Sequence, residues 1–142
     1  MLHCVFSTKE RRKQITPELA ERLYPYFGGI ARENKASLVA VGGMPDHVHL
    51  LISLPTTLSI SKAMQLIKGS SSKWIHDTFP EHRSFEWQRG YGAFSIGVSD
   101  IERTVNYINN QAFHHENRTF EEEYIAFVKR NGIEYDERYI FD

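Results

Sequence analysis

The segment His47–Leu54 constrains the fold more than any other part of the chain, because apolar residues occupy every second position. Successive side chains of a strand point to opposite faces of a sheet, so Val48, Leu50, Ile52 and Leu54 form one continuous apolar face. His47 and His49 then share the other face. A strand of this kind needs a packed layer on its apolar side and can present chemistry on the opposite side.

The neighbouring segments place this strand in an alternating order of strands and helices. Ser37–Val41 is a second strand, and the short connection Gly42–Asp46 predicts an antiparallel hairpin. Further strand patterns cover Leu2–Thr8 and Tyr91–Val98, and amphipathic helix patterns cover residues 16–34 and 59–78. The order βαββαβ is typical of a ferredoxin-like split βαβ sandwich. We therefore expect an α+β, RRM-like fold with an antiparallel sheet, two helices on one face and the other face open.

Two additional helices are expected after this unit. Ser99 with Glu102, and Thr119 with Glu122, have the spacing of a capping box at a helix start. The first pair predicts a helix over about 100–115, and the second predicts a helix that stops at Asn131-Gly132. A tail with three aromatic residues follows, which we expect to dock on the protein. We interpret residues 1–142 as one domain with extra C-terminal helices.

Composition limits the class of protein. A chain of 142 residues suits one domain, and it has no stretch of roughly 18 apolar residues that would cross a bilayer. Charges follow the apolar start rather than preceding it, which is unlike a secretory signal, and the lone Cys4 excludes a disulfide framework. We expect a cytoplasmic protein without a membrane partner. The net charge of +5 on residues 1–75 and −6 on residues 76–142 is compatible with nucleic-acid binding or with two differently charged solvated faces.

His47 and His49 are candidate metal ligands, because two imidazoles at positions i and i+2 of a strand can bind one cation. The alternative is a pair of half-exposed histidines without a metal. Tyr107 and Gln111 are spaced i, i+4 and therefore project from the same side of the expected helix. A glutamine oxygen with two imidazoles suits Mg²⁺ or Mn²⁺ better than a structural zinc, and the tyrosine hydroxyl could act as a nucleophile. Alternatively, Tyr107 packs at the rim of the helix and Gln111 is solvated.

Several other residues are candidates for DNA binding. Lysines flank a glycine- and serine-rich stretch that could approach a phosphate backbone, although a loosely wound helix explains it equally well. An aromatic-rich segment before the last strand could stack a base, but taken by itself it is better explained as a packed turn. His114 could contact phosphate or interact with the helix dipole. The candidates are Lys9, Arg11, Arg12, Lys68, Ser70, Lys73, Trp87, Arg89 and His114.

The sequence resembles the single-tyrosine HUH transposases, which include insertion-sequence TnpA-like enzymes and REP-associated tyrosine transposases. Gly43–Leu51 is similar to their HUH motif, and similar segments occur in the same order over nearly the whole chain. These segments are Phe6–Lys9, Lys68–Ser71, Trp87-Gln88, Gly90–Ser95, Tyr107–Gln111, His114-His115, Phe120–Tyr124 and Gly132–Tyr135.

The resemblance implies a transposase that cleaves and rejoins single-stranded DNA at imperfect hairpins. It assigns His47, His49 and Gln111 to a divalent cation and Tyr107 to the attack that leaves a 5′-phosphotyrosine and a free 3′-OH. Many members are homodimers in which the tyrosine helix of one protomer reaches the histidines of the other, and some relatives are monomers. Two alternatives stay open: a domesticated, non-transposing regulator that binds DNA hairpins, and an unrelated metal hydrolase.

Overall fold

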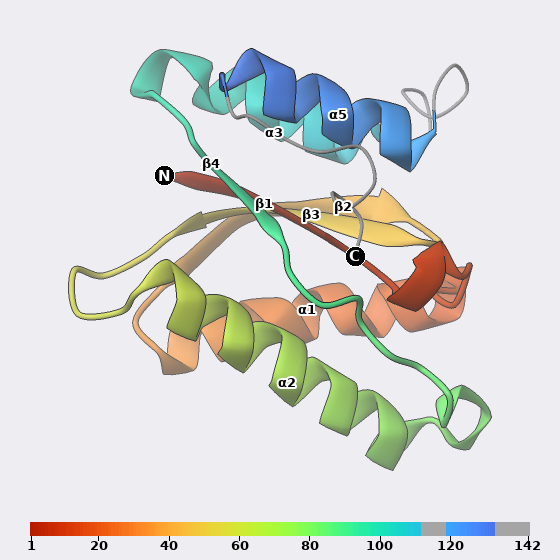
Figure 1. Ribbon diagram of the computed structural model, residues 1–142. Coiled ribbons are helices and arrows are strands. Elements are labelled where there is room, and N and C mark those ends of the chain that lie inside the picture. Colours follow the sequence, from red (N-terminus) through yellow and green to blue (C-terminus); the bar gives the residue numbers. More distant parts are fainter. Residues whose placement is uncertain (112–118, 133–142) are drawn as a thin grey trace.

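The computed structural model of the chain describes residues 1–111 and 119–132. Its sheet is antiparallel, with the strand order β2-β3-β1-β4. The strands are β1 (Leu2–Ser7), β2 (Ser37–Met44), β3 (His47–Ser53) and β4 (Gly92–Ser95). Helices α1 (Pro17–Glu33) and α2 (Ile60–Thr78) follow β1 and β3 and lie together on one face of the sheet (Figure 1). The predicted α+β ferredoxin-like fold is confirmed.

The face toward α1 and α2 is an apolar core. Each helix begins where a side chain satisfies a free backbone N–H: Thr16 Oγ1 accepts from Leu19 N and Ser59 Oγ accepts from Lys62 N. The predicted apolar stripe of α1 and most of that of α2 are buried against the apolar faces of β1 and β3, although Ile60 at the start of α2 is exposed. This core includes Cys4, Phe6, Leu19, Leu23, Phe27, Val48, Leu50, Ile52, Met64, Ile67 and Ile75.

Two more helices cover the opposite face, α3 (Ile101–Asn109) and α5 (Phe120–Arg130), as Figure 1 shows. The expectation of an open face was therefore wrong. The physical reason is that both helices are amphipathic and bury apolar side chains there: Ile108 packs with Leu51, and Phe120 and Phe127 pack in a cluster with Val5. Thr119 caps α5 as predicted, with Oγ1 accepting from Glu122 N at 3.2 Å.

The start of α3 differs from the prediction. Val98–Asp100 form a 3₁₀ turn, so Ser99 lies inside that turn rather than at a helix cap, and α3 begins after Asp100. Strand β4 ends at Ser95 and is therefore shorter than the predicted strand, and Ile96 and Gly97 connect it to this turn. The predicted tyrosine helix over about 100–115 and the tail over 133–142 fall partly or wholly outside the described residues.

The approach of α3 to the sheet depends on Gly42 of β2. A Cβ at this position would collide with the carbonyl oxygen of Ile108, so a glycine is needed for α3 to lie this close. This close packing positions the α3 side chains over the histidine-bearing face of β3. Within the described ranges, no helix is both long and apolar enough to cross a membrane.

Candidate active site

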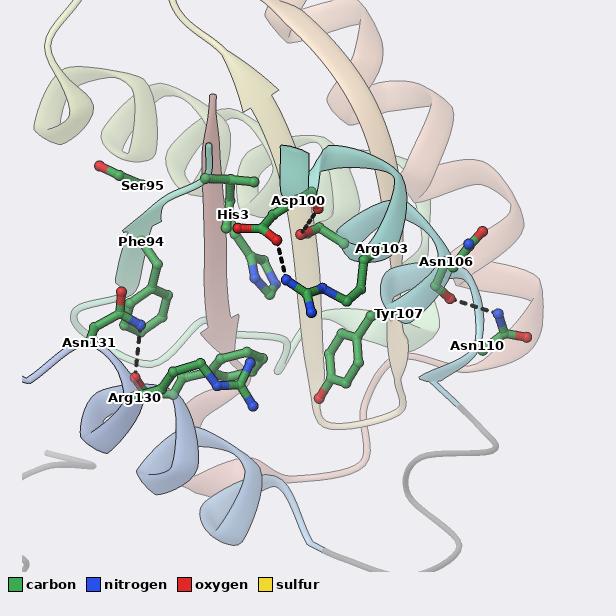
Figure 2. Close-up of a pocket in the computed structure, with 13 residues that line it drawn as sticks. His3, Phe94, Ser95, Asp100, Arg103, Asn106, Tyr107, Asn110, Arg130 and Asn131 are labelled. Carbon is green, nitrogen blue, oxygen red and sulfur yellow. Dashed lines mark hydrogen bonds and ion pairs between the residues drawn. The ribbon is translucent and has the colours of Figure 1, made fainter. Parts of the chain in front are cut away.

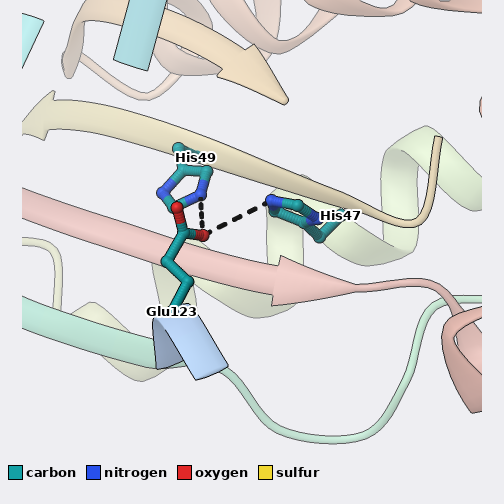
Figure 3. Close-up of side chains that lie close together, drawn as sticks. All are labelled: His47, His49 and Glu123. Atoms are coloured by element: carbon teal, nitrogen blue, oxygen red, sulfur yellow. Dashed lines mark hydrogen bonds and ion pairs between the residues drawn. The ribbon is translucent and has the colours of Figure 1, made fainter. Parts of the chain in front are cut away.

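Two histidines of β3 and one glutamate of α5 meet beneath the second helix layer. His47 and His49 are fully buried, and their Nε2 atoms lie 3.5 and 2.9 Å from Oε1 of Glu123 (Figure 3). Ligand atoms of the three residues all lie within 4.8 Å of one another. Two imidazole nitrogens and one carboxylate oxygen fit a divalent cation, so this group could hold one.

The outward-facing nitrogens of both histidines also have partners. His47 Nδ1 lies 2.6 Å from Oδ1 of Asp46, and His49 Nδ1 lies 2.8 Å from Nε2 of His3. The ring of Phe120 stacks on His47, with 4.5 Å between the centroids. Partners of this kind fix the orientation of a metal-binding imidazole and leave its Nε2 directed at the ion.

Helix α3 carries Tyr107 to this place, and Gln111, which lies just past the end of α3 at Asn109, reaches it as well. The Tyr107 hydroxyl donates to Oε2 of Glu123, the carboxylate that also contacts both histidines. Gln111 is buried, and its Oε1 lies 3.2 Å from His47 Nε2 while its amide donates to the Tyr107 carbonyl. The structure therefore brings all four sequence-predicted site residues together within one chain. His47, His49 and Tyr107 contact Glu123, and Gln111 contacts His47.

The electrostatics of the site follow from burial and hydrogen bonding. Burial alone would lower the pKa of His47, but hydrogen bonds with Asp46 and Glu123 outweigh it and raise the pKa to about 9. Burial likewise would raise the pKa of Glu123, but hydrogen bonds from His47, His49 and Tyr107 hold it well below its usual range. Burial lowers the pKa of His3 to about 3, so this imidazole is neutral near pH 7.

Sequence reasoning missed Glu123 and His3. Glu123 lies between Glu122 and Tyr124 in a run of three glutamates at a helix start, where acidic residues are favoured by the helix dipole. One indication was available: Glu123 follows Phe120 by three positions and precedes Phe127 by four, so a charged residue stands on the apolar stripe. His3 shares its strand face with Val5, but its contact with His49 depends on the pairing of β1 with β3.

Four of the predicted DNA-binding cations lie in ion pairs with carboxylates. Lys9 pairs with Glu86, Arg12 with Glu10 and Lys73 with Asp77. The side chains of these three cations are at least half exposed. Arg11 pairs with Glu121 of α5 and so connects the segment after β1 to the helix that carries Glu123.

The other predicted DNA-binding residues lie in different surroundings. Lys68 Nζ donates to the carbonyls of Gln88 and Gly90, at 2.7 and 2.6 Å. The Trp87 ring contacts Phe6 and Phe85 and its Nε1 donates to Ser71, so this ring packs against the core. Trp87 forms an antiparallel bridge with Thr8 rather than lying in the predicted turn. Ser70 is half-buried on α2 and Arg89 is exposed. His114 lies outside the described residues.

Comparison with known proteins identifies the family. The sequence model of the IS200-like transposases matches residues 1–111, so the chain belongs to this family of DNA-cleaving and strand-transferring enzymes. It is 28% identical over 114 residues to the ISDra2 transposase TnpA of Deinococcus radiodurans, covering 77% of this chain and 81% of that protein. It is 26% identical over 115 residues to the transposase for insertion sequence element IS200 of Salmonella typhimurium, covering 77% and 74%.

Solved structures share the fold. A protein of Deinococcus radiodurans R1 described as a transposase superposes with a TM-score of 0.65 at 28% identity, over 78% of this chain and 88% of that one. The structure of a REP-associated tyrosine transposase bound to a REP hairpin superposes with a TM-score of 0.62 at 18% identity, over 94% and 81%.

Proposed function

We propose that this chain is a metal-dependent nuclease and strand transferase for single-stranded DNA, in which Tyr107 attacks a phosphodiester near a hairpin. Its products are a 5′-phosphotyrosine on the protein and a free 3′-OH on the DNA. The observation that carries the proposal is the position of Tyr107: its hydroxyl donates to Glu123, which also contacts His47 and His49. Nucleophile and candidate metal ligands therefore meet at one carboxylate.

The residues present fit a divalent cation such as Mg²⁺ or Mn²⁺. His47, His49 and Glu123 would hold it, and Gln111 Oε1 is a fourth donor close to His47. When bound, such a cation screens the negative charge that develops on the phosphate oxygens. Asp46 and His3 support the two imidazoles from behind and so keep both Nε2 atoms directed into the site.

Tyr107 must lose its proton during the attack. An unperturbed tyrosine has a pKa near 10 and is a weak nucleophile at neutral pH. Glu123 accepts a hydrogen bond from the hydroxyl and so orients it. As the bond between the tyrosine oxygen and phosphorus forms, the phenolic proton passes to solvent, the bond to the 3′ oxygen breaks, and that oxygen takes up a proton. The phosphotyrosine conserves the energy of the broken bond, so a later attack by a 3′-OH rejoins the strand without an external energy source.

The proposed substrate is single-stranded DNA that contains a hairpin. A REP hairpin is bound by the REP-associated transposase that shares this fold, and family membership makes a DNA substrate the natural extension to this chain. The alternative of a domesticated, non-transposing hairpin regulator is not favoured, because the proposed nucleophile and its metal-binding partners are all present and in contact.

Covalent trapping tests the proposal. The purified chain is incubated with Mn²⁺ and hairpin-bearing oligonucleotides taken from the DNA on both sides of its gene, and adducts are detected by denaturing electrophoresis. Tyr107→Phe should abolish the adduct and retain hairpin binding. Tyr91→Phe is the matched control, because Tyr91 is exposed and lies outside the site. An adduct of normal yield in Tyr107→Phe would end the assignment of the nucleophile.

We further propose that Tyr107 acts on DNA bound at the histidines of its own chain, whether or not the predicted homodimer forms. Support comes from the Tyr107–Glu123 hydrogen bond within one chain. A mixture of Tyr107→Phe and His49→Ala proteins discriminates the two arrangements. It should stay inactive if each chain completes its own site, whereas recovery of adduct formation in the mixture would require tyrosines that act across a dimer.

A further inference from the structure

A cavity of about 810 Å³ opens beside Tyr107, between α3 and α5 and above the edge of the sheet (Figure 2). Its lining includes three aromatic or imidazole rings, those of His3 of β1, Phe94 of β4 and Phe127 of α5. The volume lies within the range of roughly 300–1,000 Å³ that small-molecule sites occupy. The cavity is therefore large enough for a nucleotide.

The cavity adjoins the reacting groups directly. Tyr107 forms part of its wall, and its hydroxyl is bonded to Glu123. His3 forms part of the lining and contacts His49. A molecule in the cavity would consequently lie next to any phosphate that Tyr107 attacks.

The rim of the cavity is polar and carries net positive charge. Asn106 of α3 and Asn131 at the end of α5 both line it (Figure 2), and Asn131 Nδ2 donates to the Phe127 carbonyl. Asparagine amides can both donate to and accept from the edges of a base. Arg130 lies over the Phe127 ring at 5.5 Å, and Arg103 is paired with Asp100, so the lining holds two arginines and one aspartate. A charge of this sign suits a phosphodiester chain that enters the cavity.

We propose that this cavity binds the base of one unpaired nucleotide next to the scissile phosphate, and so positions that phosphate for Tyr107. The inference rests on the proposed function and adds a nucleotide subsite to it. Aromatic and apolar side chains together with amide groups are the combination by which proteins hold unstacked bases of single strands. Since α5 lies outside residues 1–111, the part of this cavity that Phe127, Arg130 and Asn131 line comes from a segment that the family match does not cover.

The test uses hairpin oligonucleotides with 2-aminopurine, a fluorescent base, or an abasic site at each unpaired position in turn. Fluorescence on binding and the rate of adduct formation are measured for the wild type and for Asn106→Ala and Arg130→Ala. Asn109→Ala and Lys129→Ala are matched controls, because these exposed residues lie on the same helices and do not line the cavity.

One unpaired position should respond unlike all others. In the wild type and the controls, 2-aminopurine fluorescence changes there on binding, and an abasic site there slows adduct formation roughly 5- to 150-fold, the range given by loss of one stacked base. The two cavity variants should lose the fluorescence change and become insensitive to the abasic site. A flat scan, or cavity variants that behave as the controls do, overturns the subsite. A position-specific fluorescence change without any adduct supports the subsite and counts against the proposed nuclease instead.

Discussion

The two faces of the sheet bury different kinds of side chains. Among the described residues, the face toward α1 and α2 buries apolar groups such as Phe6, Leu50 and Phe27. The face toward α3 and α5 buries His3, His47, His49, Gln111 and Glu123 together with a smaller set of apolar side chains. Adjacent residues of one strand, His49 and Leu50, are both completely buried and yet belong to these different environments.

The contrast indicates a division of labour. Burial of apolar area stabilises a fold, whereas a buried imidazole or carboxylate costs free energy unless its hydrogen bonds are satisfied. The polar groups beneath α3 and α5 satisfy one another, with Glu123 as the central acceptor. A cluster that is held at this cost, next to a cavity, is typical of a functional site rather than of a stabilising core.

Truncation of the apolar face should have the largest effect on stability. Leu50→Ala removes buried methyl groups and leaves a cavity, so the free energy of unfolding should fall by about 2–5 kcal/mol in urea titrations. Metal binding by the protein that remains folded should not change. Val39→Ala, at a position that is 45% exposed, is the control and should stay within about 0.5 kcal/mol of the wild type. A small loss in Leu50→Ala would contradict the assignment of the core to this face.

Replacement of His3 should have its main effect on metal affinity. Because His3 is neutral, its Nε2 can accept the Nδ1 proton of His49 and so leave His49 Nε2 free for a cation. His3→Phe keeps a ring but loses this nitrogen, and Mn²⁺ affinity should fall about 10- to 100-fold in isothermal titration. His3→Gln retains a hydrogen-bonding group and should recover most of the affinity. Equal affinities in the wild type and in His3→Phe would show that His3 only fills space.

Much of the sheet face toward α1 and α2 could be predicted from the sequence, because apolar alternation and helical periodicity depend on local geometry. The strand His47–Ser53 and the stripe of α1 occur where the pattern predicts them, and Thr119 caps α5. The packing of α3 and α5 over the opposite face could not be predicted in this way. No local sequence pattern indicates that α5 packs over β3. The register that places His3 beside His49 forms only when β1 pairs with β3.

The site shows the same limit. The H-x-H spacing lies within one strand, and the Tyr107–Gln111 spacing runs from α3 to just past its end; the structure brings these residues together. Glu123 is 74 positions from His49, and the two residues before it are also glutamates, so its sequence context resembles an ordinary helix start. A single sequence does not show which elements far apart in the chain contact one another.

Replacement of Lys68, at the rim of the apolar face, should have a smaller effect on stability that depends on pH. Burial lowers the pKa of Lys68 from 10.5 to about 8, so the folded state disfavours the ammonium relative to the unfolded chain. The wild type should therefore gain stability relative to Lys68→Met as the pH rises from 8 to 10.5, and lose that gain as the pH falls back through 8. Urea midpoints of both proteins at pH 7 and pH 9.5 measure the change. Parallel midpoints at the two pH values would show that Lys68 is solvated in the folded protein.

The smallest effect on stability is expected for Lys73→Ala on the outer surface of α2, and this variant can break the division between the faces. The Lys73–Asp77 pair is exposed and spans 3.6 Å, so its loss should change the free energy of unfolding by less than about 0.5 kcal/mol. If Lys73 contacts a DNA phosphate, as predicted from the sequence, the slope of log K for hairpin binding against log salt should shrink by about 0.7–0.9. Asp77→Ala removes the partner instead and should not reduce the slope. If Lys73→Ala leaves the slope unchanged, Lys73 of α2 does not contact the DNA. DNA contacts would then lie on the side of the sheet that carries Tyr107, and the two faces would differ in function as well as in the side chains that they bury.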